Sequence, residues 1–340
     1  MNKKLKVCLE VVLIAVLTFI VTLSSPFNLW ITNSFTDVQN EILDIAYSVR
    51  EGYLAYVELD GHYGPVVYEF FGLGYLAENA QLVHYIMEFV LLFVGIMYTY
   101  KTAKLFTSEI FAFVATGILT IFGWGSLTHA GAEEILFFFV ALTSYHVARQ
   151  LKSGYLSYHT YLLAIDFGLV FFLQPGYAFI WLVLIIFFAV KFKLDGLEGK
   201  KYRSYYASVV EGIITVGVPM GLYLWYFKNA GEFFTQVVVY NIKHMGGFAG
   251  GLKILCVTPW SILFIVLVVA IIIKKSQGGD VTSLCCWIGL LAVAIIVIAL
   301  QGDNLSSFIV PLKAFYIVPL AAGFSLIDKA IGLKVEEREF

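Results

Sequence analysis

Three acidic side chains with helical spacing are the first residues in this sequence with a chemical use. Asp37, Glu41 and Asp44 follow an i, i+4, i+7 pattern, which places their carboxylates on one face of a helix. A carboxylate can accept the proton of a hydroxyl group and so make that hydroxyl a nucleophile. A solvated acidic helix face is the alternative interpretation. Asp37 is the better catalytic candidate, because it stands at the expected helix start, shortly after a long apolar run.

Other polar residues of chemical interest lie at turns or inside apolar runs. His62 precedes a Gly-Pro turn, and His129, Glu133 and Glu134 lie just before and at the start of another apolar run. Lys313 lies inside the last apolar run, near its expected outer end, where an ammonium group facing the bundle would suit a phosphate. Each has a structural alternative: a tight turn for His62, a favourable helix dipole for the glutamates and snorkelling for Lys313.

The elements that position these residues are membrane helices. The chain has 340 residues, of which 60% are hydrophobic and 14% charged, and its mean hydropathy is +0.85, too apolar for one water-soluble core. We predict an all-α bundle of about ten spans, guided by the roughly 20 apolar residues that a crossing helix needs. The predicted spans are Val7–Leu23, Leu82–Tyr100, Ile110–Trp124, Ile135–Ala148, Tyr161–Leu173, Ala178–Val190, Val209–Tyr226, Leu255–Ile273, Ser283–Leu300 and Phe308–Ile327.

The orientation follows from the basic residues, which favour the cytoplasmic side of short loops. With both termini in the cytoplasm, the inner segments collect all of the 22 Lys and Arg residues except Arg50, Lys228, Lys243, Lys253 and Lys313. This count depends on a turn at Gln174-Pro175-Gly176, which divides residues 161–190 into two spans. We expect a single membrane domain, with residues 1–250 as a core module and 251–340 as additional C-terminal helices.

Two predicted outer segments, residues 24–81 and 227–254, are longer than a simple connection needs, and long loops often carry function. In the first, Thr36 is expected to cap a helix that ends at Gly52, and Pro65 to open a second helix too short to span. Both would lie along the outer membrane surface. The second segment is expected to form an interfacial helix, followed by glycines at 246–251 that let it move.

Several function classes have no support in the sequence. It contains no P-loop, GxSxG, HExxH or dinucleotide-binding motif, and no basic stretch that suits nucleic acid. Its four cysteines have no CxxC spacing and imply no disulfide framework.

Motifs in the predicted outer segments match a known pattern in order and placement. They are Thr36-Asp37, His62-Tyr63-Gly64-Pro65, Leu73-Gly74, Ala130-Gly131-Ala132-Glu133-Glu134, Phe171-Phe172-Leu173-Gln174-Pro175 and Val239-Tyr240-Asn241. Together they resemble the bacterial GT-C glycosyltransferases, relatives of protein O-mannosyltransferases and aminoarabinose transferase. The resemblance covers residues 1–250. The chain departs from the family pattern at Gly61, at Tyr63 in place of a lysine, and at Ser306.

The resemblance implies an inverting membrane glycosyltransferase of the bacterial cytoplasmic membrane. It would move a sugar from a polyprenyl-phosphate carrier to an envelope glycan, lipid or protein at the outer face. Asp37 would be the general base. The residues expected to bind substrate or the donor phosphate are Lys313, His62, Glu133, Glu134 and Tyr56. A divalent metal is possible but not required.

Two other functions remain open. Acidic residues in or near the spans, Glu10, Glu88, Asp166 and Glu211, would suit a transporter or lipid-carrier flippase, although they are scattered and no repeat is visible. The departures at Gly61, Tyr63 and Ser306 would suit a non-catalytic relative that assists polysaccharide assembly.

Overall fold

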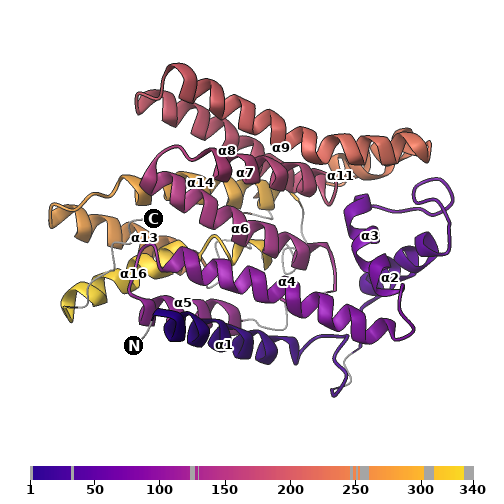
Figure 1. The fold of residues 1–340 in the computed structure, drawn as a ribbon, viewed down its shortest axis with the longest axis horizontal. Coiled ribbons are helices and arrows are strands. Elements are labelled where there is room, and N and C mark those ends of the chain that lie inside the picture. The colour runs from indigo at the N-terminus through magenta and orange to yellow at the C-terminus, as the bar shows by residue number, and fades with distance from the viewer. Residues whose placement is uncertain are drawn as a thin grey trace.

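The computed structural model is a bundle of helices, most of which run along its long axis (Figure 1). It describes residues 3–31, 34–122, 127–128, 130–245, 248–249, 252, 260–301 and 310–332. In this part of the chain no β-strand occurs, and Ala55 and Leu59 form an isolated bridge. The all-helical prediction is therefore confirmed for the described residues.

Two groups of helices build the molecule. The bundle helices are α1 (Lys3–Thr22), α4 (Ala80–Ala103), α5 (Glu109–Ile121), α6 (Ala132–Ser153), α7 (Ser157–Phe171), α8 (Pro175–Leu194), α9 (Gly199–Tyr226), α13 (Trp260–Ser276), α14 (Thr282–Leu300) and α16 (Ile317–Ala330). The shorter helices at one end are α2 (Asp37–Arg50), α3 (Pro65–Gly74), α10 (Ala230–Phe233), the π-helix η2 (Phe234–Val239) and α11 (Tyr240–Lys243). In Figure 1, α2, α3 and α11 lie at one end, while α1 begins and α16 ends at the other.

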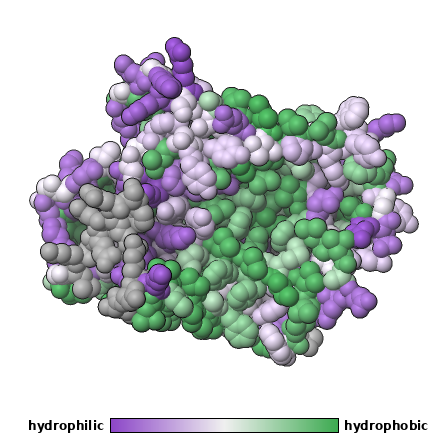
Figure 2. Space-filling model, viewed as in Figure 1, coloured by the Kyte–Doolittle hydropathy of each residue, from purple (hydrophilic) through white to green (hydrophobic). Residues whose placement is uncertain are grey.

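Six helical stretches are long and apolar enough to cross a membrane. They are Lys4–Thr22, Ala80–Ala103, Pro175–Leu194, Gly199–Tyr226, Thr282–Leu300 and Val310–Ala330. α5 has 13 residues, which at the helical rise gives a length of about 20 Å, less than the hydrocarbon core. Figure 2 shows a broad hydrophobic band with hydrophilic residues toward both ends. These features suggest a multi-pass membrane protein, and the finer count of about ten spans stays a prediction.

The capping residue and the prolines that predict helix starts lie at helix starts in the structure. The Thr36 side chain accepts a hydrogen bond from the Gln39 backbone N–H at 3.3 Å, and the Gln39 side chain accepts from Thr36 N, so a capping box starts α2. Pro65 and Pro175 occupy the first turns of α3 and α8, which suits a residue without a backbone N–H. α7 and α8 are separate helices, as the Gln174-Pro175 turn predicts.

Ion pairs join three helices at the end opposite to α2 and α3. The Lys104 ammonium contacts Glu10 of α1 at 2.8 Å and Glu109 of α5 at 3.1 Å, and Lys6 contacts Glu109 at 2.6 Å. Asp328 of α16 accepts from the backbone N–H of Ser108, the residue just before α5, at 2.7 Å. Glu10 therefore has a structural partner, which removes it from the acids that would suggest ion coupling.

Buried polar contacts fix α6 against α7 and α8. The Thr143 hydroxyl donates to Asp166 at 2.9 Å and accepts from the Trp181 indole N–H at 2.7 Å. His146 and His159 bring their Nδ1 atoms within 2.6 Å of each other. C-terminal helices join the same bundle, because α14 packs on α8 and α6, and α16 packs on α5 and α13.

Candidate functional site

The loop between α1 and α4 docks on the turn between α7 and α8 through backbone hydrogen bonds. Gly64 N donates to Leu173 O at 2.8 Å, and Val66 N donates to Phe172 O at 3.2 Å. A Cβ atom at Gly64 would lie 1.9 Å from Phe172 O, so only glycine permits this approach. Two motifs of the resemblance, 110 residues apart in sequence, are thus in direct contact.

Amide side chains from the segment after α9 bind the same loop from another side. Asn229, Gln236 and Asn241 donate to backbone carbonyls of the loop, and Gln236 also accepts from Gly61 N. The bonds are Asn229 Nδ2 to Ala55 O, 3.3 Å; Gln236 Nε2 to Tyr56 O, 2.7 Å; Asn241 Nδ2 to His62 O, 3.0 Å; and Gly61 N to Gln236 Oε1, 3.1 Å. The two long predicted outer segments therefore form one layer.

Asp37 lies in the first turn of α2 and is exposed. Glu41 and Asp44 are also exposed, whereas Ile42 and Ala46 on the same helix are buried. The helix thus presents its acidic face outward and its apolar face to the protein, as the sequence pattern predicts. An exposed carboxylate at this place is available to a substrate, although the same exposure suits a solvated face.

Tyr56 has a structural position inside the docked loop. It is 2% exposed, its φ of 72° lies in the left-handed region, and its hydroxyl donates to Tyr63 O at 2.8 Å. The pKa of the Tyr56 hydroxyl is raised well above its ordinary value, mainly by burial and to a smaller extent by the nearby phenol of Tyr68. Tyr56 therefore holds the loop in shape and stays protonated, which is a different use from the predicted substrate contact.

His62 is partly buried beside α11. Its ring stacks on Tyr240, with centroids 3.8 Å apart and planes 6° apart, and Tyr240 stacks in turn on His244 at 3.9 Å. The Nδ1 atom of His62 is buried and meets no hydrogen-bond partner among the described residues. This leaves one imidazole nitrogen of the predicted site with an unused hydrogen-bonding capacity.

Glu133 and Glu134 are buried in the first turn of α6 and face different surroundings. Glu134 Oε2 accepts from Ala130 N at 3.0 Å, and Ala130 has a φ of 44°. Glu134 also lies close to the buried Glu88 of α4. Glu133 instead lies near Tyr63. Burial is the main cause that raises the pKa of the Tyr63 hydroxyl, and the negative charge of Glu133 raises it further.

Lys313 lies deeper in the bundle than the sequence indicates. Its side chain is buried, and the two residues after it bond to bundle helices: Ser144 Oγ donates to Ala314 O at 3.3 Å, and the Trp287 indole donates to Phe315 O at 3.1 Å. Ser144 lies about 16 Å along α6 from Glu133, given the rise per residue. The expectation that Lys313 lies near the outer end is therefore wrong, and no described contact brings it to Asp37.

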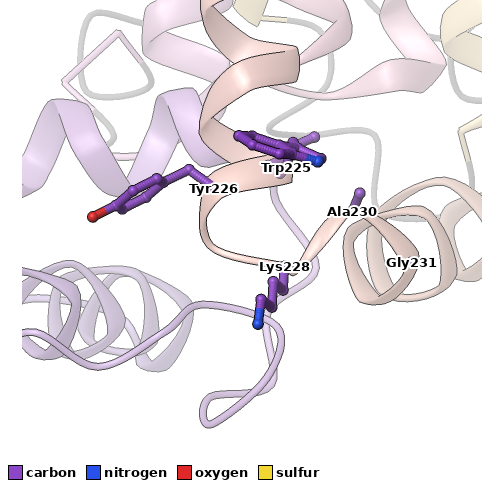
Figure 3. A pocket seen from close by; sticks show the side chains of 6 residues that line it. Trp225, Tyr226, Lys228, Ala230 and Gly231 are labelled. Atoms are coloured by element: carbon purple, nitrogen blue, oxygen red, sulfur yellow. The ribbon is translucent and has the colours of Figure 1, made fainter.

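Two hollows lie near this end of the molecule. An apolar groove of about 160 Å³ runs between α7, α8 and the η2–α11 segment, with Phe171, Pro175 and Asn241 among its lining residues. Another hollow, of about 350 Å³, lies where α9 turns into α10. Figure 3 shows that Tyr226 and Lys228 at this second hollow point away from each other, so their polar atoms do not converge on one ligand.

No metal-binding group is visible in the described part of the chain, where no three His, Cys, Asp or Glu side chains gather as ligands. His129 and most of the glycine segment at 246–251, on which the sequence analysis also relied, lie outside the described residues.

Sequence reasoning missed the residues that connect the motifs. Tyr177, at the start of α8, is fully buried and lies within electrostatic range of Glu133 and Tyr63. Asn229 and Gln236 also hold the loop, but isolated amides in an outer segment give no signal of partners 174 to 180 residues away. Tyr177 had a clearer signal, since it follows the Gln-Pro-Gly turn that the resemblance singles out.

No protein-family model, curated protein or solved structure matches this chain.

Proposed function

We propose that this chain is a membrane glycosyltransferase that moves a sugar from a polyprenyl-phosphate carrier to an acceptor hydroxyl at the outer face of the membrane. Asp37 is the general base that accepts the proton of the acceptor hydroxyl. The lipid phosphate leaves with the electron pair of the sugar–oxygen bond, and the acceptor oxygen takes its place at the anomeric carbon.

The observation that carries this proposal is the docking of the first loop. The loop before α3 is fixed to the end of the bundle through the Gly64–Leu173 hydrogen bond and through Gln236, and α2, with Asp37 at its exposed start, packs on α3. A base must be held in place to act on a hydroxyl group, and a rigid support provides that. The apolar groove between α7, α8 and the η2–α11 segment offers a place for the lipid chain of the donor, and Asn241 both lines it and bonds to the docked loop, although Asp37 lines neither of the two described hollows.

The position of Lys313 changes the choice of residue for the leaving phosphate. The Lys313 side chain is buried, and its neighbour Ala314 bonds to the middle of α6, whereas Asp37 is exposed at the start of α2. His62 takes this role in the proposal, because its buried Nδ1 has no partner in the described structure and can donate a hydrogen bond to an anion.

Sugar transfer in reconstituted membranes tests the proposal. Purified protein in liposomes is given a panel of polyprenyl-phosphate sugars, and release of the polyprenyl phosphate is measured. Asp37→Asn is expected to lower the rate by about 10² to 10⁴. Asp44→Asn is the matched control, an exposed carboxylate on the same helix, and is expected to keep the wild-type rate. Equal rates for wild type and Asp37→Asn would exclude Asp37 as the base.

The same liposomes separate the two rival functions. A flippase would move a labelled lipid-linked sugar across the bilayer without releasing the carrier phosphate. A non-catalytic relative would do neither. Either result, obtained with correctly folded wild-type protein across the donor panel, overturns the transferase proposal.

A further inference from the structure

The connection between α8 and α9 carries the largest group of basic residues in the chain. Residues 191–203, called the basic connection below, contain five basic and two acidic side chains: Lys191, Lys193, Lys200, Lys201, Arg203, Asp195 and Glu198. Both helices are long and apolar enough to cross a membrane, so in a membrane the residues that join them lie at its surface. Figure 1 shows this connection at the end of the bundle opposite to α2 and α3.

Most of these basic side chains have no partner within the described part of the protein. Lys191 forms an ion pair with Asp195. The other four are exposed and make no hydrogen bond or ion pair with any described residue: Lys193, Lys200, Lys201 and Arg203. Lys104, at the same end of the bundle, is instead bound between Glu10 and Glu109. The basic connection therefore presents positive charge that the described protein leaves unpaired.

Aromatic residues on α9 indicate how deep the basic side chains lie. Tyr206 and Trp225 are 48% and 75% exposed, and exposed Tyr and Trp favour the two interfaces of a membrane. They are 19 residues apart, which at the helical rise is about 29 Å, close to the roughly 30 Å of the hydrocarbon core. Residues 199–205 of α9 therefore extend beyond the hydrocarbon and into the layer of lipid headgroups.

The apolar side chains around the basic connection also suit a lipid surface. Exposed aliphatic residues recur every four positions along α9, at Val210, Ile214, Val218 and Leu222, so this face of the helix is turned toward lipid. Leu194, at the end of α8, is 82% exposed although it is apolar and has charged neighbours. At a bilayer surface, such an apolar side chain enters the edge of the hydrocarbon while the neighbouring basic groups reach the phosphates.

We propose that the basic connection is a binding surface for the headgroups of anionic phospholipids, in the leaflet opposite to the end that carries Asp37. Its unpaired ammonium and guanidinium groups favour a headgroup with net negative charge, such as phosphatidylglycerol. Phosphatidylcholine is disfavoured, because its phosphate is accompanied by a cation. This surface lies at the other end of the bundle from the proposed transfer site and does not depend on sugar transfer.

Native mass spectrometry of the full chain in a neutral detergent tests this surface. Dissociation constants are measured for phosphatidylglycerol and for phosphatidylcholine with the same acyl chains, and we expect phosphatidylglycerol to bind more tightly. The double variant Lys200→Gln/Lys201→Gln should lower this preference by about fivefold for each lysine, as expected for a basic residue near an anionic surface. Lys274→Gln/Lys275→Gln is the matched control, a pair of exposed lysines in the last turn of α13, and should keep the wild-type preference.

Two further measurements separate the lipid surface from simpler explanations. Lys200→Arg/Lys201→Arg keeps both charges and should keep the preference, which distinguishes charge from a change in packing. Inorganic phosphate, which has no acyl chain, should not displace phosphatidylglycerol at an equal concentration.

Four results would overturn the inference. They are equal affinity for the two phospholipids, equal losses in the two lysine-to-glutamine variants, loss of the preference in the arginine variant, and displacement by inorganic phosphate. None of them bears on the transferase proposal, which Asp37→Asn tests separately.

Discussion

Replacing Gly64 with alanine tests whether the first loop is docked as described. The added Cβ would lie 1.9 Å from Phe172 O and 2.9 Å from Leu173 N. Carbon–oxygen contacts in proteins begin at about 3.3 Å, so the α7–α8 turn and residue 64 must move apart by more than about 1 Å. The Gly64–Leu173 hydrogen bond, 2.8 Å long, cannot survive that movement.

The cost of Gly64→Ala combines overpacking with the lost hydrogen bond. Overpacking costs about 1–3 kcal/mol, and the hydrogen bond about 1 kcal/mol more. The backbone φ of Gly64 is −71°, so steric contact alone causes the effect. This cost destabilises the docked state of the loop relative to an open state. Each 1.4 kcal/mol raises the population of the open state tenfold, so backbone amides at 61–66 should exchange about 10- to 1000-fold faster.

Hydrogen–deuterium exchange with mass spectrometry on the detergent-solubilised chain measures this change. Gly72→Ala is the matched control on α3, where the nearest atom to an added Cβ is Ala46 O at 3.5 Å, an ordinary contact. It should leave exchange at 61–66 unchanged and slightly stabilise the helix. Equal protection of these amides in Gly64→Ala and wild type would refute the docked geometry, and with it the support for Asp37.

Further predictions concern other contacts of the described structure. Gln236→Ala removes the bonds to Gly61 N and Tyr56 O, so exchange at 56–61 should rise about tenfold or more, whereas exposed Thr235→Ala should leave it unchanged. Thr143→Val leaves Asp166 and Trp181 without a shared partner and should lower stability by about 1–3 kcal/mol, seen as a lower Tm; an unchanged Tm would contradict the buried network. Hydrogen bonds from the Thr282 N–H and hydroxyl hold the pKa of Asp280 below its ordinary value. The contact therefore stabilises the start of α14 at every pH above the ordinary pKa of an aspartate, and this stabilisation is lost as the pH falls through the lower pKa of the folded state. Hydrogen exchange at the Thr282 amide should rise only in that acidic range.

Local signals in the sequence were sufficient for the starts of α2, α3 and α8, whereas α9 begins at Gly199, ten residues before the predicted Val209. Thr36, Pro65 and Pro175 act through backbone geometry within a few residues, so the capping box and the two proline starts could be predicted without a partner. The bundle helices could be predicted from apolar runs, because such a run is also a local property of the sequence. Their number as membrane spans is less certain, since a 13-residue helix such as α5 meets the apolar pattern but falls short of the bilayer thickness.

Depth within the bundle could not be read from the sequence, and Lys313 illustrates why. A lysine near the start of an apolar run looks close to a membrane surface if the run is one straight crossing. The segment around it instead bonds to Ser144 in the middle of α6 and to Trp287 in the first half of α14. That position depends on contacts 28 to 170 residues away, which no local pattern records.

The division of residues 161–190 into two helices decides whether the first loop can dock on the bundle. If they formed one straight span, Leu173 would lie near its middle, and its carbonyl would bond within the helix. The carbonyl instead accepts from Gly64 N, because the chain turns at Gln174-Pro175 and frees the last carbonyls of α7. The turn predicted from the proline and from the count of basic residues is therefore the same feature that docks the first loop. Without it, the first loop, which carries α2 and Asp37, would lose its backbone bonds to the bundle.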